Sequence, residues 1–481
     1  RVPGLGAKTA LLLFETLGIA DLDELEQAAR EHRLAGLPGL GEKTEENILK
    51  GIALAREGGE RHPLGRVLPQ AEELAAELLR IAPLHRLEIA GSLRRRRESV
   101  KDIDLVGTSP RPQEVMEAFV SLPSVREVLM RGATRSTVVW RDRLQVDLRV
   151  VEEHQFGAAL AHLTGSGSHN VRLREMAVRQ GLKVNEYGIF AAGGTRLGGE
   201  EEGDLYRLLG LPWIPPELRE DRGEVEAAAE GTLPELLRAE DIRGDLHAHT
   251  HWSDGNLSLE ELAQAARARG YSWMAVTDHS MRLAIAHGMS IDRLMEQQRE
   301  VRELNRRLEG FTLLHGAEVD ILPDGRLDFP DEVLRELDLV IGAVHSAFGQ
   351  TRETMTARII AAMRHPFVTT VAHPTGRLIG VREGYEVEME ALLRAAAETR
   401  TAMEINSHPL RLDLADLHVK RGKELGVSFA IGSDAHSARE LDHLPLGMSV
   451  ARRGWLERED LLNTLEAPEL LRRLKRKRGA G

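Results

Sequence analysis

The stretch GSLRRRRESVKDIDLV, Gly91–Val106, joins a Gly-Ser turn and a run of four arginines to an Asp-x-Asp pair on an apolar, strand-like segment. In a strand, residues i and i+2 project from the same face, so Asp102 and Asp104 point the same way. Two facing carboxylates repel each other unless a cation lies between them. A third carboxylate, Asp147 in LQVDLRVV, lies on another strand-like segment that could be adjacent. The pattern predicts a site for two divalent ions, with a solvent-facing strand edge as the alternative for the pair alone.

A short repeat opens the chain. VPGLGAKTA (2–10) recurs as LPGLGEKTE (37–45), and each copy is a Pro-Gly-x-Gly turn that leads into a helical pattern. The exposed N–H groups at such a helix start can hold an anion. The repeat indicates tandem helix-hairpin-helix motifs that grip the DNA backbone without reading sequence, with two glycine-capped helical hairpins as the alternative. The candidate DNA-binding residues of the two copies are Gly4, Gly6, Lys8, Gly39, Gly41 and Lys43.

From Asp245 onward, short apolar segments alternate with helical ones, which predicts a parallel sheet closed into a β/α barrel. The first segment ends in DLHAHTHWSDG (245–255), where His247 and His249 alternate and therefore face one way. Further metal-type residues close later segments, and the carboxyl ends of barrel strands converge on one mouth. These metal-ligand candidates are His247, His249, Asp254, His279, Glu318, His345, His373, Asp434 and His436. His251 has no assigned role and is expected to be a surface or supporting residue.

Composition limits the chemistry. The 481 residues include no cysteine, which excludes disulfides, thiolate nucleophiles and Cys-ligated zinc. Histidine and carboxylate ligands suit Zn²⁺, Mn²⁺ or Fe²⁺, and the sequence does not choose among them. The net charge of -12 argues weakly against nucleic-acid binding, but local basic clusters such as Arg94–Arg97 matter more than the sum. The sequence has no apolar run long enough to predict a membrane span, and the cytoplasm is the expected compartment. Because the sequence starts at Arg1 and not at a methionine, we expect a fragment.

The Gly-Ser-x-Arg-Arg and Asp-x-Asp pattern resembles the nucleotidyltransferase palm of the family X DNA polymerases. LTGSGSHNVRLREMAVRQGLKVNEYGIF (163–190) is similar to the thumb of that family, and the resemblance covers about residues 1–221. It implies that Asp102 and Asp104 ligate both palm ions, Mg²⁺ or Mn²⁺. It also implies that Asp147 ligates the ion that activates the primer 3′-oxygen and could act as its base. The residues that it assigns to the incoming nucleotide, the nascent base pair or the template are Arg66, Gly91, Ser92, Arg95, Asn170 and Arg174.

The chain departs from this family at two places. Many members have an aromatic pair before Thr-Gly, near the sugar of the incoming nucleotide, where this sequence has His162 and Leu163. Discrimination against ribonucleotides is therefore an open question. The N-terminal lyase domain of the family, with its Schiff-base lysine, has no visible counterpart, and we expect that it was removed upstream of Arg1.

The second half resembles the PHP (polymerase and histidinol phosphatase) domain, a distorted seven-stranded β/α barrel with three metal ions. The resemblance implies a first ion held by four side chains, which are His247, His249, Glu318 and Asp434. Glu318 would bridge to a second ion completed by His345 and His373. Three further side chains would hold the third ion, and these are Asp254, His279 and His436. Arg377 and Arg411 are each either a phosphate contact or part of a salt bridge at the barrel rim.

Together these observations predict a multidomain α/β fold. Its expected segments are a helix-hairpin-helix region (1–60), a palm (61–155), a thumb (156–221), a linker (222–242), a PHP barrel (243–471) and a basic tail (472–481). The favoured function is gap-filling DNA synthesis in repair with 3′-5′ exonuclease or other 3′-end processing, including AP endonuclease activity, in the PHP domain. The expected partners are gapped or nicked DNA and deoxynucleoside triphosphates, with no membrane and a monomeric state. Two alternatives are a histidinol phosphatase-like phosphomonoesterase with a DNA-binding first half, and a DNA-binding scaffold without activity.

Overall fold

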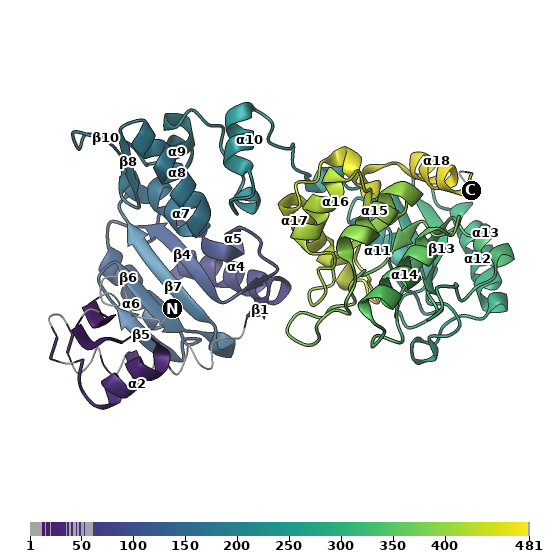
Figure 1. Ribbon diagram of the computed structural model, residues 1–481, viewed down its shortest axis with the longest axis horizontal. Helices are drawn as coiled ribbons and strands as arrows, with labels where there is room; N and C mark the ends of the chain where they lie inside the picture. Colours follow the sequence, from purple (N-terminus) through teal and green to yellow (C-terminus); the bar gives the residue numbers. More distant parts are fainter. Residues whose placement is uncertain are drawn as a thin grey trace. The chain divides into compact units, whose positions relative to one another are not determined.

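The computed structural model divides the chain between Thr232 and Leu233 into two compact units (Figure 1). It describes residues 61–479 continuously and, before them, residues 12–14, 16–19, 21–34, 36–37, 40–41, 45, 48–49 and 52. The division falls inside the predicted linker. The acidic stretch at the start of that linker forms helix α10 (Glu224–Glu230), which packs against the first unit through buried Glu224 and His169.

The described part of the first 60 residues contains helix α2 (Leu22–Arg30) and a small apolar core. Within that core, the buried carboxylate of Glu45 accepts hydrogen bonds from the backbone N–H of Leu34 at 2.8 Å and the ring of His32 at 2.9 Å. Gly41 belongs to this part and has no atom near the place of an added Cβ. The other predicted DNA-contacting residues of the repeat, Gly4, Gly6, Lys8, Gly39 and Lys43, lie outside the described residues.

A five-stranded sheet with the order β2-β4-β7-β6-β5 forms the predicted palm. Its strands are β2 (Arg86–Ile89), β4 (Asp102–Thr108), β5 (Glu127–Arg131), β6 (Arg135–Val139) and β7 (Gln145–Val151). Strands β4 and β7 are parallel, and the other pairs are antiparallel. Buried Ile103 and Leu105 alternate with the half-buried aspartates, so one face packs on helices and the other carries the carboxylates. The helices of this region are α4 (Leu64–Ile81), α5 (Gly91–Arg94) and α6 (Pro112–Val120), and β1 (His62–Pro63) pairs with β3 (Ser99–Val100).

The predicted thumb combines helices with a small antiparallel sheet. Its elements are α7 (Phe156–Thr164), α8 (Gly167–Arg179), β8 (Leu182–Asn185), β9 (Gly188–Ala191), β10 (Arg196–Gly198) and α9 (Gly203–Leu208). Helix α8 begins at Gly167 because the Ser166 hydroxyl accepts a hydrogen bond from the backbone N–H of His169 at 3.2 Å.

The second unit is a nearly closed barrel of seven parallel strands in sequential order. The strands are β11 (Gly244–Asp245), β12 (Trp273–Val276), β13 (Thr312–Asp320), β14 (Leu339–Ala343), β15 (Thr370–Val371), β16 (Ala402–Asn406) and β17 (Phe429–Gly432). A single parallel bridge between Ala248 and Ala435 joins the extensions of the first and last strands. Strand residues are buried almost throughout, as expected for a parallel sheet covered by helices.

Helices surround the barrel strands (Figure 1). They are α11 (Leu259–Ala268), α12 (Ile291–Asn305), α13 (Asp331–Arg335), α14 (Arg352–Met363), α15 (Met389–Thr399), α16 (Asp416–Glu424), α17 (Leu444–Arg453) and α18 (Ala467–Arg478). Helix α18 includes most of the predicted basic tail, and its Leu470 and Leu474 join the core inside the barrel. Among the described residues, no helix has the length and apolar character that a membrane crossing requires.

Candidate active sites

The three palm aspartates lie on adjacent strands. Asp104 in β4 and Asp147 in β7 are register partners, and Asp102 stands two residues before Asp104 on the same face. Burial first, and then the neighbouring carboxylates, raise the pKa of Asp104 to about 8 and raise that of Asp102. Carboxylates crowded in this way fit an oxygen-liganded cation, which would remove their mutual repulsion.

Residues of β6 and β7 donate hydrogen bonds to the carboxylate of Asp147. Thr137 and Gln145 each donate a hydrogen bond to its carboxylate at 2.6 Å, and Arg135 donates one at 3.2 Å. Within the described part of the chain, the groups of metal-type side chains whose ligand atoms converge within 4.8 Å all belong to the barrel. A cation at the palm would therefore compete with Arg135 for Asp147.

The Gly-Ser turn closes directly over Asp104. Gly91 has φ +62° and begins helix α5, and a Cβ added to it would lie 2.1 Å from Asp104 Oδ2. The backbone N–H of Ala90 also donates to the carbonyl of Asp104 at 2.8 Å. Only glycine allows this approach, so Gly91 places the start of α5 and half-buried Ser92 next to the aspartates.

The run of arginines makes ion pairs with residues more than 100 positions later. Arg94 donates to both carboxylate oxygens of Glu202, at 2.6 and 3.0 Å, and Glu202 also accepts a hydrogen bond from the fully buried Arg219 at 2.6 Å. Arg95 donates to Glu220 at 3.0 Å and to the carbonyl of Thr164. The structure thus gives the predicted triphosphate ligand Arg95 an acidic partner, whereas the other candidate, Arg66, lies exposed on α4.

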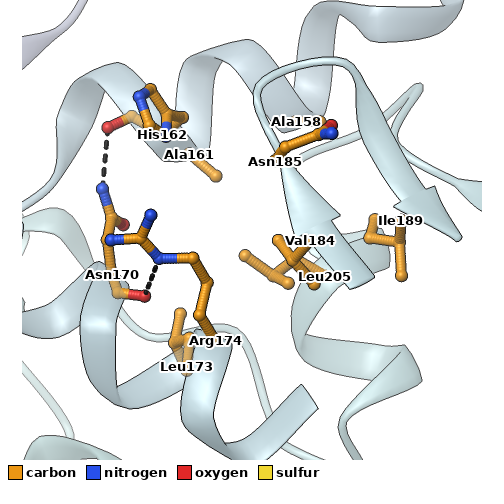
Figure 2. A pocket seen from close by; sticks show the side chains of 10 residues that line it. All are labelled: Ala158, Ala161, His162, Asn170, Leu173, Arg174, Val184, Asn185, Ile189 and Leu205. Atoms are coloured by element: carbon orange, nitrogen blue, oxygen red, sulfur yellow. Dashed lines mark hydrogen bonds between the residues drawn. The ribbon is translucent and has the colours of Figure 1, made fainter. Parts of the chain in front are cut away.

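A small pocket in the thumb brings together two predicted template or base-pair contacts (Figure 2). Asn170 and Arg174 lie one turn apart on α8, and Arg174 Nε donates to the carbonyl of Asn170 at 3.1 Å. The amide of Asn170 donates to the carbonyl of His162 at 2.8 Å. Burial is the main cause that lowers the pKa of His162, so a neutral imidazole lies beside these two side chains.

The barrel mouth is centred on Glu318, a fully buried carboxylate in β13. Its Oε1 lies 2.9 Å from His373 Nε2 and 3.3 Å from His345 Nε2. Its Oε2 lies 2.8 Å from His279 Nδ1, 3.5 Å from His247 Nε2 and 3.7 Å from His249 Nε2. Both oxygens of this carboxylate therefore face imidazole nitrogens, and together these groups could hold metal ions.

A second convergence lies around Asp254, which follows the first strand. His436 Nε2 is 3.3 Å from its Oδ1, and His279 Nε2 is 3.6 Å from its Oδ2. His279 therefore lies between Asp254 and Glu318 and belongs to both groups. His251 lies outside them, exposed, with its ring 3.1 Å from the carbonyl of Leu257.

The charges at the barrel mouth favour positive charge on the histidine side chains, which either protons or metal ions can supply. Burial disfavours charged imidazoles, yet Glu318 and the neighbouring carboxylates outweigh it and raise the pKa of His345 to about 9 and that of His279 to about 10. The same histidines hold the pKa of Glu318 well below its ordinary value. In addition, the Nδ1 atoms of His249 and His373 are buried and have no hydrogen-bond partner among the described residues. Unsatisfied buried ligand atoms of this kind are what a bound ion would complete.

Comparison with known proteins identifies the family. Residues 1–53 match the model of a SAM-like helix-hairpin-helix tandem, residues 159–220 that of a DNA polymerase beta thumb, and residues 245–408 that of a PHP domain. The chain is 40% identical over 479 residues to the DNA polymerase/3′-5′ exonuclease PolX of Bacillus subtilis (strain 168), covering 99% of this chain and 84% of that protein. The chain belongs to the PolX family. Divalent metal ions are therefore part of its chemistry.

Two further proteins each match about half of this PolX chain. A probable phosphatase of Thermoanaerobacter sp. (strain X514) is 29% identical over 249 residues, which is 49% of this chain and 96% of that protein. A crystal structure of Leishmania infantum polymerase beta, described as a ternary P/T complex, is 24% identical with a TM-score of 0.36 and covers 46% of this chain and 95% of that one. The match to PolX over 99% of this chain, together with the thumb and PHP domain models, confirms the prediction of a family X polymerase with a PHP domain.

Two carboxylates that the sequence analysis missed contact candidate metal ligands of this PolX chain. His247 Nδ1 lies 2.6 Å from Glu404 in β16, and His345 Nδ1 lies 2.5 Å from Asp320 in β13. Such partners fix the ring orientation and raise the basicity of the nitrogen left for a metal. The sequence does carry a signal for Asp320: in AEVD it follows Glu318 by two residues, so both side chains lie on the same face of the strand.

The loop that carries Asp254 is fixed by the buried carboxylate of Asp278, beside His279. Asp278 accepts five hydrogen bonds, from the backbone and hydroxyl groups of Thr250 and Ser253 and from Gln297. It therefore positions Asp254.

The two arginines predicted at the rim have different partners. Arg411 Nε lies 3.5 Å from the ligand Asp434, whereas Arg377 donates to the backbone carbonyls of Arg411 and Leu412. Arg411 is thus beside the candidate metal ligands, and Arg377 supports the loop that holds it.

Proposed function

We propose that the chain fills gaps in DNA during repair, with synthesis at the palm and removal of 3′-terminal nucleotides at the PHP barrel. The observation that carries this is the match to a DNA polymerase/3′-5′ exonuclease PolX across 99% of the chain, supported by the candidate ligands that converge in the barrel and by the three aspartates on adjacent strands of the palm. The proposed substrates are gapped or nicked DNA and deoxynucleoside triphosphates. A monomer in the cytoplasm is the proposed working state.

At the palm, Asp102, Asp104 and Asp147 are proposed to hold Mg²⁺ or Mn²⁺, which suits oxygen ligands. Asp147 is proposed to accept the proton of the primer 3′-hydroxyl. Ser92, at the start of α5, and Arg95 are proposed to bind the incoming phosphates, which would displace Glu220 from the guanidinium of Arg95. When bound at the two sites, divalent ions neutralise developing charge and lower the pKa of the attacking oxygen.

At the barrel, the nine candidate ligands are proposed to hold three ions of Zn²⁺, Mn²⁺ or Fe²⁺. Glu318 would supply an oxygen to more than one of these ions, because each of its oxygens faces a different set of histidines. Arg411, whose Nε lies 3.5 Å from Asp434, is proposed to contact a phosphate of the cleaved strand. The same site could also process blocked 3′ ends or abasic sites.

A labelled gapped duplex tests the proposal. It is incubated with Mg²⁺ or Mn²⁺, with and without nucleotides, using the wild type, Asp147→Ala and His345→Ala. Asp147→Ala should abolish extension and keep 3′ degradation, and His345→Ala should do the reverse. Glu88→Ala, an exposed carboxylate in β2, and His251→Ala are matched controls that should change neither activity. Extension by Asp147→Ala at the wild-type rate would remove the palm assignment.

A phosphomonoesterase is the alternative, because probable phosphatases match the barrel half. The relative from Thermoanaerobacter sp. (strain X514) aligns with 49% of this chain, so it accounts for neither the palm nor the repeat. Rapid hydrolysis of a free phosphomonoester, with no action on a DNA 3′ end, would favour this alternative.

A further inference from the structure

A pocket of about 340 Å³ lies at the end of the barrel opposite the metal-type cluster. Thr369, Ala402 and Ser428 line it, and each stands immediately before or at the start of its strand, β15, β16 or β17. Helix α18 contributes another wall through Leu474 and Lys477. The candidate ligands occupy the carboxyl ends of the strands, so this pocket is separate from the site described above.

Three cationic side chains line the pocket, and no acidic one does among the described residues. Arg400 is exposed, Arg473 is half-buried, and Lys477 is 6% exposed. Within the described part of the chain, none of the three lies within ion-pair distance of a carboxylate. The pocket therefore presents a positive charge that the protein itself does not balance.

The buried ammonium of Lys477 is the strongest indication that the pocket binds an anion. Its ammonium donates to the carbonyl of Met363, at the end of α14, at 3.0 Å and to the hydroxyl of Thr401. Both acceptors are neutral, and burying an ammonium without an opposite charge is costly. Burial lowers the pKa of Lys477 to about 7, which expresses that cost. An anion in the pocket would remove it.

The remaining walls suit a small organic molecule. Leu462, Leu474 and Ala396 are apolar, and the volume lies in the range of small-molecule sites. Arg473 already places its guanidinium by donating to Ser428 Oγ at 2.6 Å. A guanidinium fork binds planar oxyanions, and three cations are matched better by a phosphate of two or more negative charges than by a single carboxylate.

We propose that this pocket is a binding site for a phosphate-bearing small molecule, with Lys477, Arg473 and Arg400 as its phosphate ligands. The site is independent of the polymerase and nuclease assignments. Two sources share this chemistry: inorganic phosphate or pyrophosphate, and a nucleotide whose base or sugar would use the apolar wall.

Ligand-dependent thermal unfolding of the full chain tests this proposal. The wild type, Lys477→Met, Arg473→Met and Lys475→Met are titrated with inorganic phosphate, pyrophosphate or deoxyadenosine monophosphate, with sodium chloride at matched ionic strength. Lys475 lies on the same helix, is exposed and does not line the pocket, so Lys475→Met is the matched control. At least one ligand should raise the wild-type unfolding temperature, because ligands that bind the native state stabilise it.

Lys477→Met and Arg473→Met should weaken that response about tenfold or more, since a charge-assisted hydrogen bond is lost, whereas Lys475→Met should not. A stronger response to the nucleotide than to phosphate would identify the nucleotide as the source, and equal responses would identify the phosphate group alone. The proposal fails if no ligand shifts the wild type. It also fails if both pocket variants respond like the wild type, because the anion then binds elsewhere, such as the metal centre. If Lys477→Met does not fold, Arg473→Met decides.

Discussion

Replacing Gly91 by alanine should separate the two activities of the chain. A non-glycine residue at φ +62° costs about 1–2 kcal/mol, which the first unit can absorb. The larger effect is local, because the new Cβ would lie 2.1 Å from Asp104 Oδ2, where ordinary contact begins at 3.4 Å. The carboxylate must therefore move by about 1 Å, and a displacement of that size in an active site can cost about 100-fold in rate.

Gly181→Ala is the control that isolates this displacement. Gly181 also has a positive φ, +72°, but nothing lies within 4 Å of an added Cβ. The Gly181→Ala variant therefore has similar backbone strain but does not displace a proposed catalytic group. We expect Gly181→Ala to extend primers within about threefold of the wild type and Gly91→Ala to be slower by about 100-fold.

Single-turnover primer extension on a gapped duplex measures the first activity, and 3′ degradation without nucleotides measures the second. Degradation should be unchanged in both variants, because the barrel is a separate compact unit. Near-wild-type extension by Gly91→Ala would refute the reasoning, as would equal losses in the two variants, since strain alone would then explain them.

Three further predictions concern the parts that support the sites. Asp320→Asn should slow 3′ degradation about 10–100-fold without affecting primer extension, since it weakens the hold on His345. Glu202→Gln should destabilise the first unit by about 3–5 kcal/mol, seen as a lower unfolding temperature, since it leaves Arg219 buried without its partner. The pKa of Lys477 is lowered to about 7 in the fold, against about 10.4 when unfolded, so its own contribution to the stability of the barrel rises with pH between these values, opposite in sign to that of His279 and His345. Urea unfolding at pH 7 and pH 10 should therefore show a less favourable change in stability with rising pH for Lys477→Met than for the wild type, and identical changes in the two proteins would contradict the assignment.

The side chains that the sequence predicted for the barrel mouth converge in the structure, because each is marked by a local signal. His345 and His373 each follow a short buried strand, and that position by itself places a side chain at the carboxyl end of a barrel. Glu404 was missed for the opposite reason. Its role depends on His247, 157 residues earlier, and strand AMEIN carries no sign of that pairing. Register and long-range packing decide such contacts, and neither can be read from one strand.

Charged segments were harder to interpret than apolar ones. The acidic stretch after Asp221 has the composition of a linker, but Glu224 is fully buried and lies 2.6 Å from His169 Nδ1. The basic tail likewise has the composition of a solvated segment, yet it continues α18, whose Leu470 and Leu474 enter the barrel core. In both segments a few buried residues outweigh the surrounding charge, because desolvated partners contribute more energy than exposed side chains do.

The run of arginines shows that a sequence motif can predict a fold without predicting the contacts of each of its side chains. Arg94 and Arg95 are consecutive on a one-turn helix, so they leave it in different directions, toward Glu202 and Glu220 respectively. Both side chains thus tie the palm helix to the segment that ends the thumb. A guanidinium can neutralise a carboxylate or a phosphate in the same geometry. The proposed role of Arg95 in nucleotide binding therefore requires the incoming phosphates to displace Glu220 from its guanidinium.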